Sequence, residues 1–339
     1  MNANLNIVDN PDDFSANHTV KRIGVLTSGG DAPGMNAAIR AVIRTAIYFD
    51  MEIYGIERGY EGLIEGSIKQ LDTAFAADIL QRGGTILKTA RSDDFKTAEG
   101  KRMAYSMLNN FGIDNLVIIG GDGSLRGALE LADMGINVMG IPATIDNDLA
   151  YTDFTIGFDT AINTVLTAIS NIRDTSTSHD RTTIIEVMGR ECGDIALYAG
   201  LTGGAESILI PEEPLDLAQV ARKLVQGRNR GKKHNIIIKA EGVDISSSDL
   251  ADLILENTGI GAKIVMLGYL QRGGSPTARD RMIASLMGMK AVELINEGAI
   301  NRAVAISGDS VVDYPLEEIF DFKRKYNEEI LAAADILSI

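Results

Sequence analysis

The chain of 339 residues has one cysteine, three histidines and no long apolar run. With Cys192 alone, no disulfide can form within the chain, and such cysteine usage is typical of a reducing compartment. His18, His179 and His234 lack the spacing of metal ligands, so a zinc site is not expected. No apolar run approaches membrane-spanning length, and Met1 to Thr19 is polar and acidic, unlike a secretory signal. We therefore expect a soluble, cytoplasmic protein with no membrane partner.

Aromatic residues are also scarce, and the 32 basic residues are outnumbered by 47 acidic residues. An aromatic fraction of 5% with 45% hydrophobic residues and 35 glycines suits an α/β protein with many tight turns. The formal net charge of -15 argues against a nucleic-acid partner, because the phosphates would be repelled at long range. An anionic substrate must therefore meet arginines that are concentrated locally.

The most informative segment begins with a buried strand that stops on glycines. Leu116 to Ile119 is a short run of apolar, mostly β-branched residues, which predicts a strand buried on both faces. Gly120 and Gly121 then allow a sharp turn and close approach of a ligand to the backbone. Ser124 is expected to cap the following helix, so that backbone amides converge where an anion would bind. Asp122 lies among these amides and needs a cation nearby.

A second apolar run ends in a pair of carboxylates. Asp146 and Asp148 are two residues apart, with Thr144 before them, at the point where a parallel strand would end. Ligands of open α/β sheets bind outside such carboxyl ends. One carboxylate that faces a metal and another that acts as a base, both at one crevice, would suit phosphoryl transfer.

Two further glycine-rich segments have the character of ligand-facing loops. The strand predicted from Lys21 to Thr27 leads into a glycine loop from Ser28 to Asn36 and then a helix, an arrangement that binds phosphates through backbone amides. The loop is neither a Walker A motif nor a dinucleotide fingerprint. Gln81-Arg82-Gly83-Gly84 returns as Gln271-Arg272-Gly273-Gly274, which suggests two similar ligand-facing turns.

Strand and helix patterns alternate along the rest of the chain. They predict an α/β fold of two lobes, each a mostly parallel sheet flanked by helices in a Rossmann-like three-layer arrangement, with the active-site cleft between them. Residues 1–20 are expected to be a flexible tail, and residues 173–181 a hydroxyl-rich loop. The lobe changes near Tyr151 to Gly157, and the chain crosses back near Gly273.

Five motifs in order carry a resemblance to a known family. They are Gly29-Gly30-Asp31-Ala32-Pro33-Gly34-Met35-Asn36, Gly120-Gly121-Asp122-Gly123, Thr144-Ile145-Asp146-Asn147-Asp148, Met188-Gly189-Arg190 and Gln271-Arg272-Gly273-Gly274-Ser275-Pro276. With them the chain resembles the bacterial ATP-dependent 6-phosphofructokinases. The resemblance implies a magnesium-dependent glycolytic kinase that phosphorylates fructose 6-phosphate at its 1-hydroxyl to give fructose 1,6-bisphosphate. It also implies a nucleotide-binding lobe of residues 21–156 plus about 271–320, and a sugar-phosphate-binding lobe of 157–270 plus about 321–339.

The resemblance also implies roles for single residues. Asp146 would be the base that takes the proton from the sugar hydroxyl, and Asp122 would bind Mg²⁺. The ATP-binding residues would be Gly30, Lys88, Arg91, Asp122, Gly123, Ser124 and Leu125. Around the transferred phosphoryl group would lie Thr144, Asp148, Arg190 and Arg91. The sugar phosphate would be held by Met188, Gly189, Arg190, Glu241, Arg272, Lys263 and Tyr269, and by Arg181 of a neighbouring subunit in a homotetramer.

Four positions bear on which ligands are used. Lys263 and Tyr269 stand where the family usually has an arginine and a histidine, so binding of the sugar phosphate is expected to be weaker or altered. Pyrophosphate-using relatives typically carry an aspartate at the place of Gly123 and a lysine at that of Ala143. Because Gly123 leaves room for the α-phosphate of a nucleotide, ATP is the favoured donor.

An effector site is implied as well. ADP or phosphoenolpyruvate would bind basic residues at a subunit interface, namely Arg40, Arg44, Arg173, Arg230 and Lys232, with Glu206 as the metal-side or switching carboxylate. Ser67 replaces an arginine that is usual in that pocket. Ordinary surface cations are the alternative interpretation of these residues.

Other functions stay open from the sequence. The same chemistry with pyrophosphate as donor or a longer ketose phosphate as acceptor is one alternative, and a non-catalytic nucleotide sensor is another. Lipid and NAD kinases also contain a glycine-Asp-glycine turn, but they would not be expected to carry the Thr144 to Asp148 segment.

Overall fold

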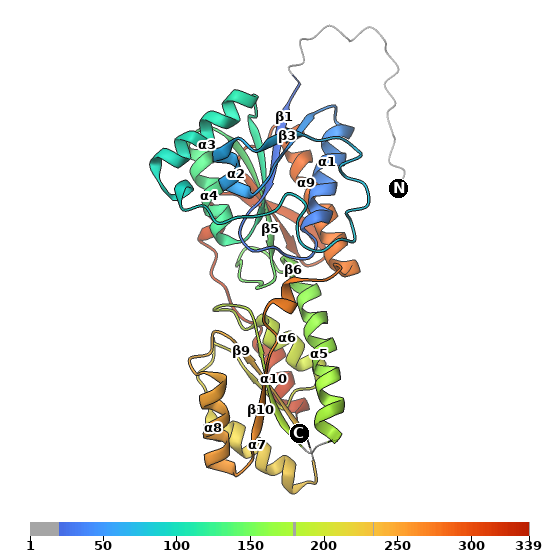
Figure 1. Ribbon diagram of the computed structural model, residues 1–339, viewed down its shortest axis with the longest axis vertical. Coiled ribbons are helices and arrows are strands. Elements are labelled where there is room, and N and C mark those ends of the chain that lie inside the picture. Colours follow the sequence, from blue (N-terminus) through green and yellow to red (C-terminus); the bar gives the residue numbers. More distant parts are fainter. Residues whose placement is uncertain (1–19, 179–180, 233, 339) are drawn as a thin grey trace.

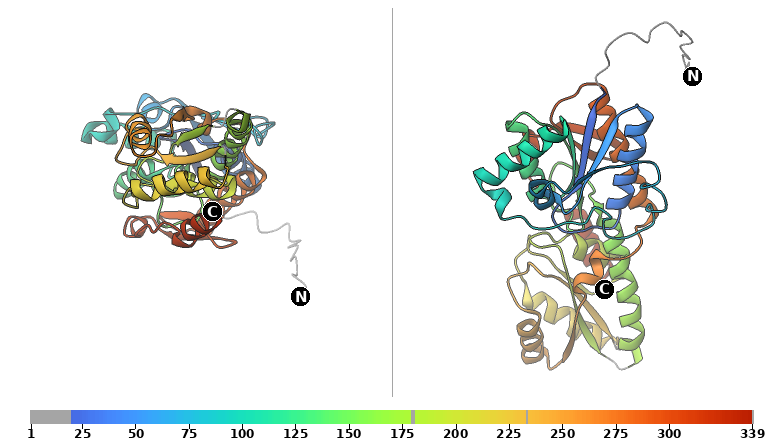
Figure 2. Two further views of the ribbon diagram at one scale, coloured as in Figure 1. Left: turned by 90° about the horizontal axis from the view of Figure 1, so that it is seen from below. Right: turned by 45° about the horizontal axis from the view of Figure 1, so that its top comes forward.

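The computed structural model describes residues 20–178, 181–232 and 234–338. They form two α/β lobes stacked along the long axis of the molecule (Figures 1 and 2). The α/β class and the mostly parallel sheets that we predicted are thus confirmed. Nearly all of the predicted tail lies outside the described residues. None of the described helices combines the length and apolarity required to cross a membrane.

The larger lobe is built on an eight-stranded sheet with the order β12-β11-β5-β4-β1-β2-β3, and β6 pairs with β5. Its strands are β1 (Arg22–Thr27), β2 (Glu52–Ile56), β3 (Ile68–Gln70), β4 (Asn115–Gly120), β5 (Asn137–Thr144), β6 (Ile156–Gly157), β11 (Arg302–Ser307) and β12 (Ser310–Pro315). The inner strands are parallel, and only β3 and β12 pair antiparallel, at the two edges.

Helices cover both faces of this sheet, as the buried strand at Leu116 to Ile119 requires. Val117 and Ile119 pack toward α1 (Met35–Tyr48) and α9 (Ala278–Asn296). Leu116 and Ile118 pack toward the opposite layer, which consists of α2 (Gly59–Glu65), α3 (Ala98–Phe111) and α4 (Asp122–Asp133). Alternate side chains of one strand therefore enter two different cores. This double burial fixes the sheet register and holds the ends of β1, β4 and β5 at one edge.

The smaller lobe contains a four-stranded parallel sheet with the order β10-β7-β9-β8. Its strands are β7 (Thr182–Val187), β8 (Ser207–Leu209), β9 (Asn235–Ala240) and β10 (Ala262–Met266). The helices around it are α5 (Phe158–Ser178), α6 (Asp194–Gly203), α7 (Leu217–Asn229), α8 (Ser247–Thr258) and α10 (Glu328–Leu337). Val220 and Leu250 place α7 and α8 against one face, whereas Ile169 and Ile195 place α5 and α6 against the other. The second cluster is continuous with the core of the larger lobe.

Within its described part, the chain passes between the lobes three times. It enters the smaller lobe through α5 and returns through the 3-10 helix η2 (Gly268–Arg272) into α9. After the 3-10 helix η3 (Glu318–Phe320) it crosses again to α10, which packs on α6 and β8. Segments distant in sequence therefore meet where the lobes join.

The predicted loop at residues 173–181 is wrong over most of its length, because α5 continues to Ser178. The hydroxyl groups do not break the helix. Ser178 donates to the Asp174 carbonyl oxygen at 3.1 Å, one turn back, and the buried Ser176 hydroxyl lies 3.0 Å from that of Thr183 on β7. Such local bonds satisfy hydroxyl groups within a helix.

Candidate active site

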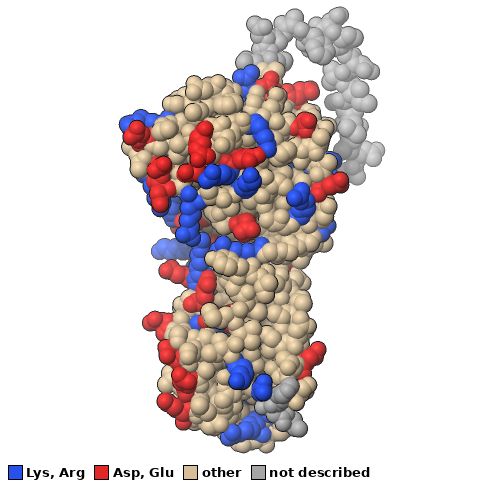
Figure 3. Space-filling model, in the orientation of Figure 1, with Lys and Arg blue, Asp and Glu red and all other residues tan. Residues whose placement is uncertain are grey.

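A cavity of about 320 Å³ opens at the carboxyl ends of β1, β4 and β5, on the side that faces the smaller lobe. It brings together residues that the sequence singled out from separate motifs. Its lining includes Gly29, Gly30, Arg91, Asp122, Gly123, Ser124, Thr144, Asp146, Asp148, Arg190 and Arg272. On the face shown in Figure 3, Lys and Arg side chains gather at the narrowing between the lobes, although the chain as a whole is strongly acidic.

The two glycine loops form one wall because they pack directly on each other. A Cβ atom at Gly120 would lie 2.6 Å from the Ser28 carbonyl oxygen and 2.5 Å from Ser124 Oγ, so only glycine allows this approach. The Ser28 amide also donates to the Ile119 carbonyl oxygen at 3.1 Å. The wall therefore presents backbone amides and the amino end of α4 to the cavity.

The prediction that Ser124 caps α4 is wrong. The helix begins at Asp122, two residues earlier, and its N-cap is Gly121, which has no side chain. Ser124 is instead in the first turn, where its hydroxyl faces Gly29 and its carbonyl oxygen accepts a hydrogen bond from Tyr60 Oη at 2.6 Å. The Ser124 amide donates to the Gly121 carbonyl oxygen at 3.0 Å, which leaves the amides of Asp122 and Gly123 to face a bound anion.

The carboxylates at the end of β5 form the opposite part of the cavity. Asp146 is only 4% exposed, and its Oδ2 lies 3.4 Å from Nε of Arg190. Burial, together with the nearby charge of Asp148, raises the pKa of Asp146 to about 6, although Arg190 opposes this shift. Burial also raises the pKa of Asp148, whose Oδ1 is buried without a hydrogen-bond partner among the described residues.

Asp122, the predicted metal ligand, has a cation beside it in the structure. Nε of Arg126, one turn further along α4, donates to Asp122 Oδ2 at 2.8 Å, and its guanidinium lies 4.5 Å from the centre of the Phe320 ring. Among the described residues there is no group of three or more His, Cys, Asp or Glu side chains that could hold a metal ion. A magnesium ion at this site would therefore need phosphate and water ligands in addition to carboxylates, which is its usual behaviour beside nucleotides.

The side of the cavity toward the smaller lobe comes from the loop after β7 and from η2. Arg190 has a left-handed backbone with φ 54°, and its amide donates to Glu241 Oε1 at 2.9 Å. The Met188 amide donates to Gln271 Oε1 at 3.2 Å, which joins this loop to η2. The Arg272 guanidinium lies 5.2 Å from the centre of the Tyr269 ring and 3.5 Å from where a Gly30 Cβ would be, so Arg272 bridges the two lobes at the cavity.

Several predicted residues lie away from this cavity in the single chain. Arg181 precedes β7 and Lys263 pairs with Thr183 near the start of β10, whereas Arg190 follows the other end of β7. Both side chains are exposed at the amino ends of their strands. The Leu125 side chain is fully buried in the core, and Lys88 Nζ lies 3.6 Å from Glu57 Oε2.

The repeated tetrads do not form two equivalent ligand-facing turns. Arg272 of the second tetrad lines the cavity, but the first tetrad packs against the second: a Cβ at Gly83 would lie 2.3 Å from the Gly274 carbonyl oxygen. Ser275 Oγ donates to the Gln81 carbonyl oxygen at 2.7 Å. The first turn therefore supports the loop that carries Arg272.

The basic residues predicted for an effector lie on both lobes. Glu206 is buried, and its Oε1 is 2.6 Å from Lys232 Nζ. Arg173 Nη2 donates to the Gly204 carbonyl oxygen at 3.0 Å at the end of α6. On the other lobe, the pKa of Arg40 is lowered by partial burial and by Arg44 one helical turn away. Arg230 follows α7 and is exposed.

Other cavity-lining residues could not be found from the sequence. Tyr60 and Phe95 stack with ring centres 4.0 Å apart beside the glycine wall, and Ser92 and Lys96 also line the cavity. They come from a short helix and from loops without a recognisable motif. Only the packing of β1, β4 and the intervening segments brings them to the cavity.

The sequence is similar to those of named enzymes over nearly its whole length. The profile of the family described as phosphofructokinase matches residues 22–295. An ATP-dependent 6-phosphofructokinase from Alkaliphilus metalliredigens is 56% identical over 320 residues, which covers 94% of this chain and 100% of the relative. One from Clostridium tetani is 54% identical over 319 residues, with coverage of 94% and 100%.

The fold is also found among solved structures. Phosphofructokinase from Saccharomyces cerevisiae matches with a TM-score of 0.84 and 36% sequence identity. The match covers 89% of this chain but 45% of the yeast chain, so the present chain spans about half the length of that protein.

Proposed function

The chain belongs to the phosphofructokinase family, and we propose that it is an ATP-dependent 6-phosphofructokinase that works through the cavity between its lobes. The reaction transfers the γ-phosphoryl group of ATP to the 1-hydroxyl of fructose 6-phosphate. One observation carries the assignment of the site: the glycine wall, the carboxylates after β5 and the arginines Arg190 and Arg272 all face a single cavity. Phosphoryl transfer needs these groups together, because positioning and charge stabilisation supply most of its catalysis.

The glycine wall would hold the phosphates of ATP. Backbone amides at Gly30 and at the amino end of α4 offer hydrogen-bond donors, and Arg91 offers a positive charge at the rim. Asp122 and Asp148 would hold Mg²⁺, since both line the cavity and Asp148 Oδ1 has no partner among the described residues. When bound, the ion would neutralise charge on the β- and γ-phosphate oxygens.

Asp146 would accept the proton of the sugar 1-hydroxyl. A base must be ionised, and its pKa of about 6 leaves it mostly ionised at pH 7 while making it a stronger base than an exposed aspartate. Activity should therefore fall as the pH drops through about 6, rather than through about 4 as for an unshifted aspartate. Arg190 would offset negative charge as the phosphoryl group moves, because its guanidinium lies next to Asp146.

The sugar phosphate would lie toward the smaller lobe. Met188, Gly189 and Glu241 belong to the loops that carry Arg190, and Arg272 stacks on Tyr269 beside them. Arg181 and Lys263 lie at the far ends of β7 and β10, so in our proposal they reach the sugar phosphate bound by another subunit of a homotetramer. The same proposal includes control by ADP or phosphoenolpyruvate, which would bind at Arg40, Arg44, Arg173, Glu206, Arg230 and Lys232. It also includes a cytoplasmic location.

ATP is the proposed donor rather than pyrophosphate. The relatives at 56% and 54% identity are named as ATP-dependent enzymes. Gly123 lines the cavity, and no atom lies within 4 Å of the position that its Cβ would take, so the space for a nucleotide α-phosphate is open.

A donor and acceptor panel tests the proposal. Purified protein is incubated with Mg²⁺ and either ATP or pyrophosphate, with fructose 6-phosphate, a longer ketose phosphate or no sugar. We expect ADP release only when ATP and fructose 6-phosphate are present together. Turnover with pyrophosphate but not with ATP, or with the longer ketose phosphate but not with fructose 6-phosphate, would show that the proposed substrate is wrong. No turnover with any pair of donor and acceptor would refute the kinase assignment.

A further inference from the structure

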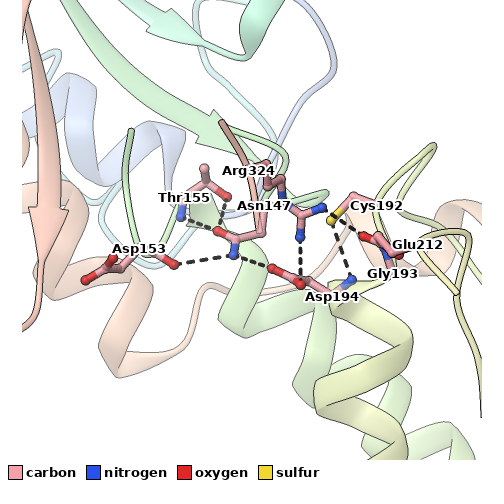
Figure 4. A network of polar contacts seen from close by, with 8 residues as sticks. All are labelled: Asn147, Asp153, Thr155, Cys192, Gly193, Asp194, Glu212 and Arg324. Atoms are coloured by element: carbon pink, nitrogen blue, oxygen red, sulfur yellow. Dashed lines mark hydrogen bonds and ion pairs between the residues drawn. The ribbon is translucent and has the colours of Figure 1, made fainter. Parts of the chain in front are cut away.

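Asn147 lies between the proposed base Asp146 and Asp148 in the sequence, and its side chain enters a polar network with Asp153, Thr155 and Asp194 (Figure 4). The residue is buried and has a left-handed backbone with φ 53°. This conformation is uncommon outside glycine, although asparagine adopts it more readily than most residues. The turn that presents the two carboxylates therefore depends on what holds Asn147.

The Asn147 amide forms hydrogen bonds through both its nitrogen and its oxygen. Its Nδ2 donates to Asp194 Oδ2 at 2.8 Å and to the Asp153 carbonyl oxygen at 3.3 Å. Its Oδ1 accepts from the Thr155 amide at 3.0 Å and lies 3.3 Å from Thr155 Oγ1. The Thr155 hydroxyl donates its one proton to the Thr144 carbonyl oxygen, 2.7 Å away at the end of β5. One side chain thus links the carboxylate turn to the larger lobe and to α6 of the smaller lobe.

Asp194 is in turn held from the far side. It is the first residue of α6, and its Oδ1 lies 2.7 Å from Arg324 Nη2 on the segment that returns from η3 to α10. Arg324 Nη1 also contacts Glu212 Oε1 at 3.0 Å, and Glu212 accepts from the Gly193 amide at 2.9 Å. Arg324 therefore fixes both the side chain of Asp194 and the backbone just before it (Figure 4).

The position of α6 matters because the loop before it carries Arg190. Only three residues lie between Arg190 and Asp194, and Arg190 itself has a left-handed backbone. The hydrogen bond from Asn147 to Asp194 consequently connects the turn of Asp146 with the loop of Arg190 through buried groups. Without it, the 3.4 Å contact between Arg190 and Asp146 would rest on the partly exposed arginine side chain alone.

We propose that Asn147, Asp194 and Arg324 are positioning residues that set the distance between Asp146 and Arg190 across the lobe junction. The inference rests on the proposed function, in which Asp146 is the base and Arg190 offsets the charge of the phosphoryl group. Displacement of reacting groups by about 1 Å can cost about 100-fold in rate. The network therefore acts on the chemical step and leaves the glycine wall that binds ATP intact.

The test compares Asn147→Gly with Asn137→Gly. Glycine keeps the left-handed backbone at 147, so the first variant removes the amide without adding strain. Asn137 is at the other end of β5, where its amide likewise contacts Asn115, Ala299 and Asn301, remote from the cavity. We expect Asn147→Gly to lower kcat by about 10-fold or more, with the KM for ATP changed by less than about 3-fold. Asn137→Gly should lower the melting temperature and leave kcat of the folded protein unchanged.

The split between kcat and KM separates positioning from general destabilisation. Loosening the contact between Arg190 and Asp146 should slow the folded enzyme and leave its KM for ATP nearly unchanged, whereas general destabilisation should lower only the fraction of folded enzyme. Arg324→Gln removes the charge that holds Asp194 and should lower kcat in the same way, by less. If Asn147→Gly does not fold, the kcat of Arg324→Gln tests the inference in its place.

The results distinguish this inference from the proposed function. Wild-type protein that fails to phosphorylate fructose 6-phosphate would refute the proposed function. If the wild type is active, this inference alone is overturned when folded variants keep the wild-type kcat, when the KM for ATP rises by as large a factor as kcat falls, or when Asn137→Gly shows the same loss of kcat.

Discussion

Replacing Gly123 with aspartate should separate nucleotide use from folding. Gly123 is in the first turn of α4 and lines the cavity, and an added Cβ would meet no atom within 4 Å. The new side chain therefore fits without moving the backbone. Aspartate has a better helix propensity than glycine and suits the amino end of a helix, which offsets repulsion by Asp122, so we expect the free energy of unfolding to change by less than about 1 kcal/mol.

The added carboxylate should nevertheless oppose ATP. A charge about 5 Å from a phosphate oxygen, at an effective dielectric constant of about 20, gives a repulsion of about 3 kcal/mol, or roughly 100-fold in kcat/KM for ATP. The assay measures ADP release with saturating fructose 6-phosphate, and urea unfolding in parallel. Gly123→Asn has nearly the same size without the charge and should lose much less activity. A Gly123→Asp enzyme with wild-type kcat/KM, or one no worse than Gly123→Asn, would refute the reasoning.

Two further substitutions test groups that support the site. Asp280 is buried and its pKa is raised from 3.8 to about 6, so its ionisation lowers the free energy of unfolding by about 3 kcal/mol as the pH rises through this range. Asp280→Asn should remove this part of the pH dependence of urea unfolding between pH 4 and 7. A free-energy difference between wild type and variant that stays constant from pH 4 to 7 would contradict the prediction. Gly83→Ala should lower the free energy of unfolding by about 1–3 kcal/mol and reduce activity, because its Cβ would press on the loop that carries Arg272, whereas Gly261→Ala, with open space around it, should do neither.

The parts of the fold and site that sequence could predict are those encoded locally. Buried β-branched runs such as Leu116 to Ile119 have one stable placement in a protein of this composition, inside a sheet covered on both faces. Gly120 and Gly121 at the end of this run mark where the backbone turns toward a ligand. Asp146 and Asp148 directly follow the next apolar run. The two-lobed α/β fold and the family were therefore predicted and are confirmed.

The failures have two physical causes, which are nearby hydrogen bonds that composition does not reveal and contacts with residues far away in the chain. The Ser176 hydroxyl is satisfied by Thr183 on a strand, so a hydroxyl-rich segment expected as a loop stays helical. The first of the two similar tetrads serves the second through the contact of Gly83 with Gly274. The hydrogen bond from Asn147 to Asp194 joins residues that are 47 positions apart, and no local sequence pattern reveals it.

The roles of individual site residues remain predictions that activity measurements must test. The central claim is that one cavity binds ATP through the glycine wall and uses Asp146 as the base. The most direct measurement is turnover of Asp146→Asn together with its affinity for Mg²⁺–ATP. The account predicts that kcat falls by about 100-fold to 10,000-fold, while nucleotide affinity changes by less than about 3-fold. An Asp146→Asn enzyme that keeps wild-type turnover would contradict it.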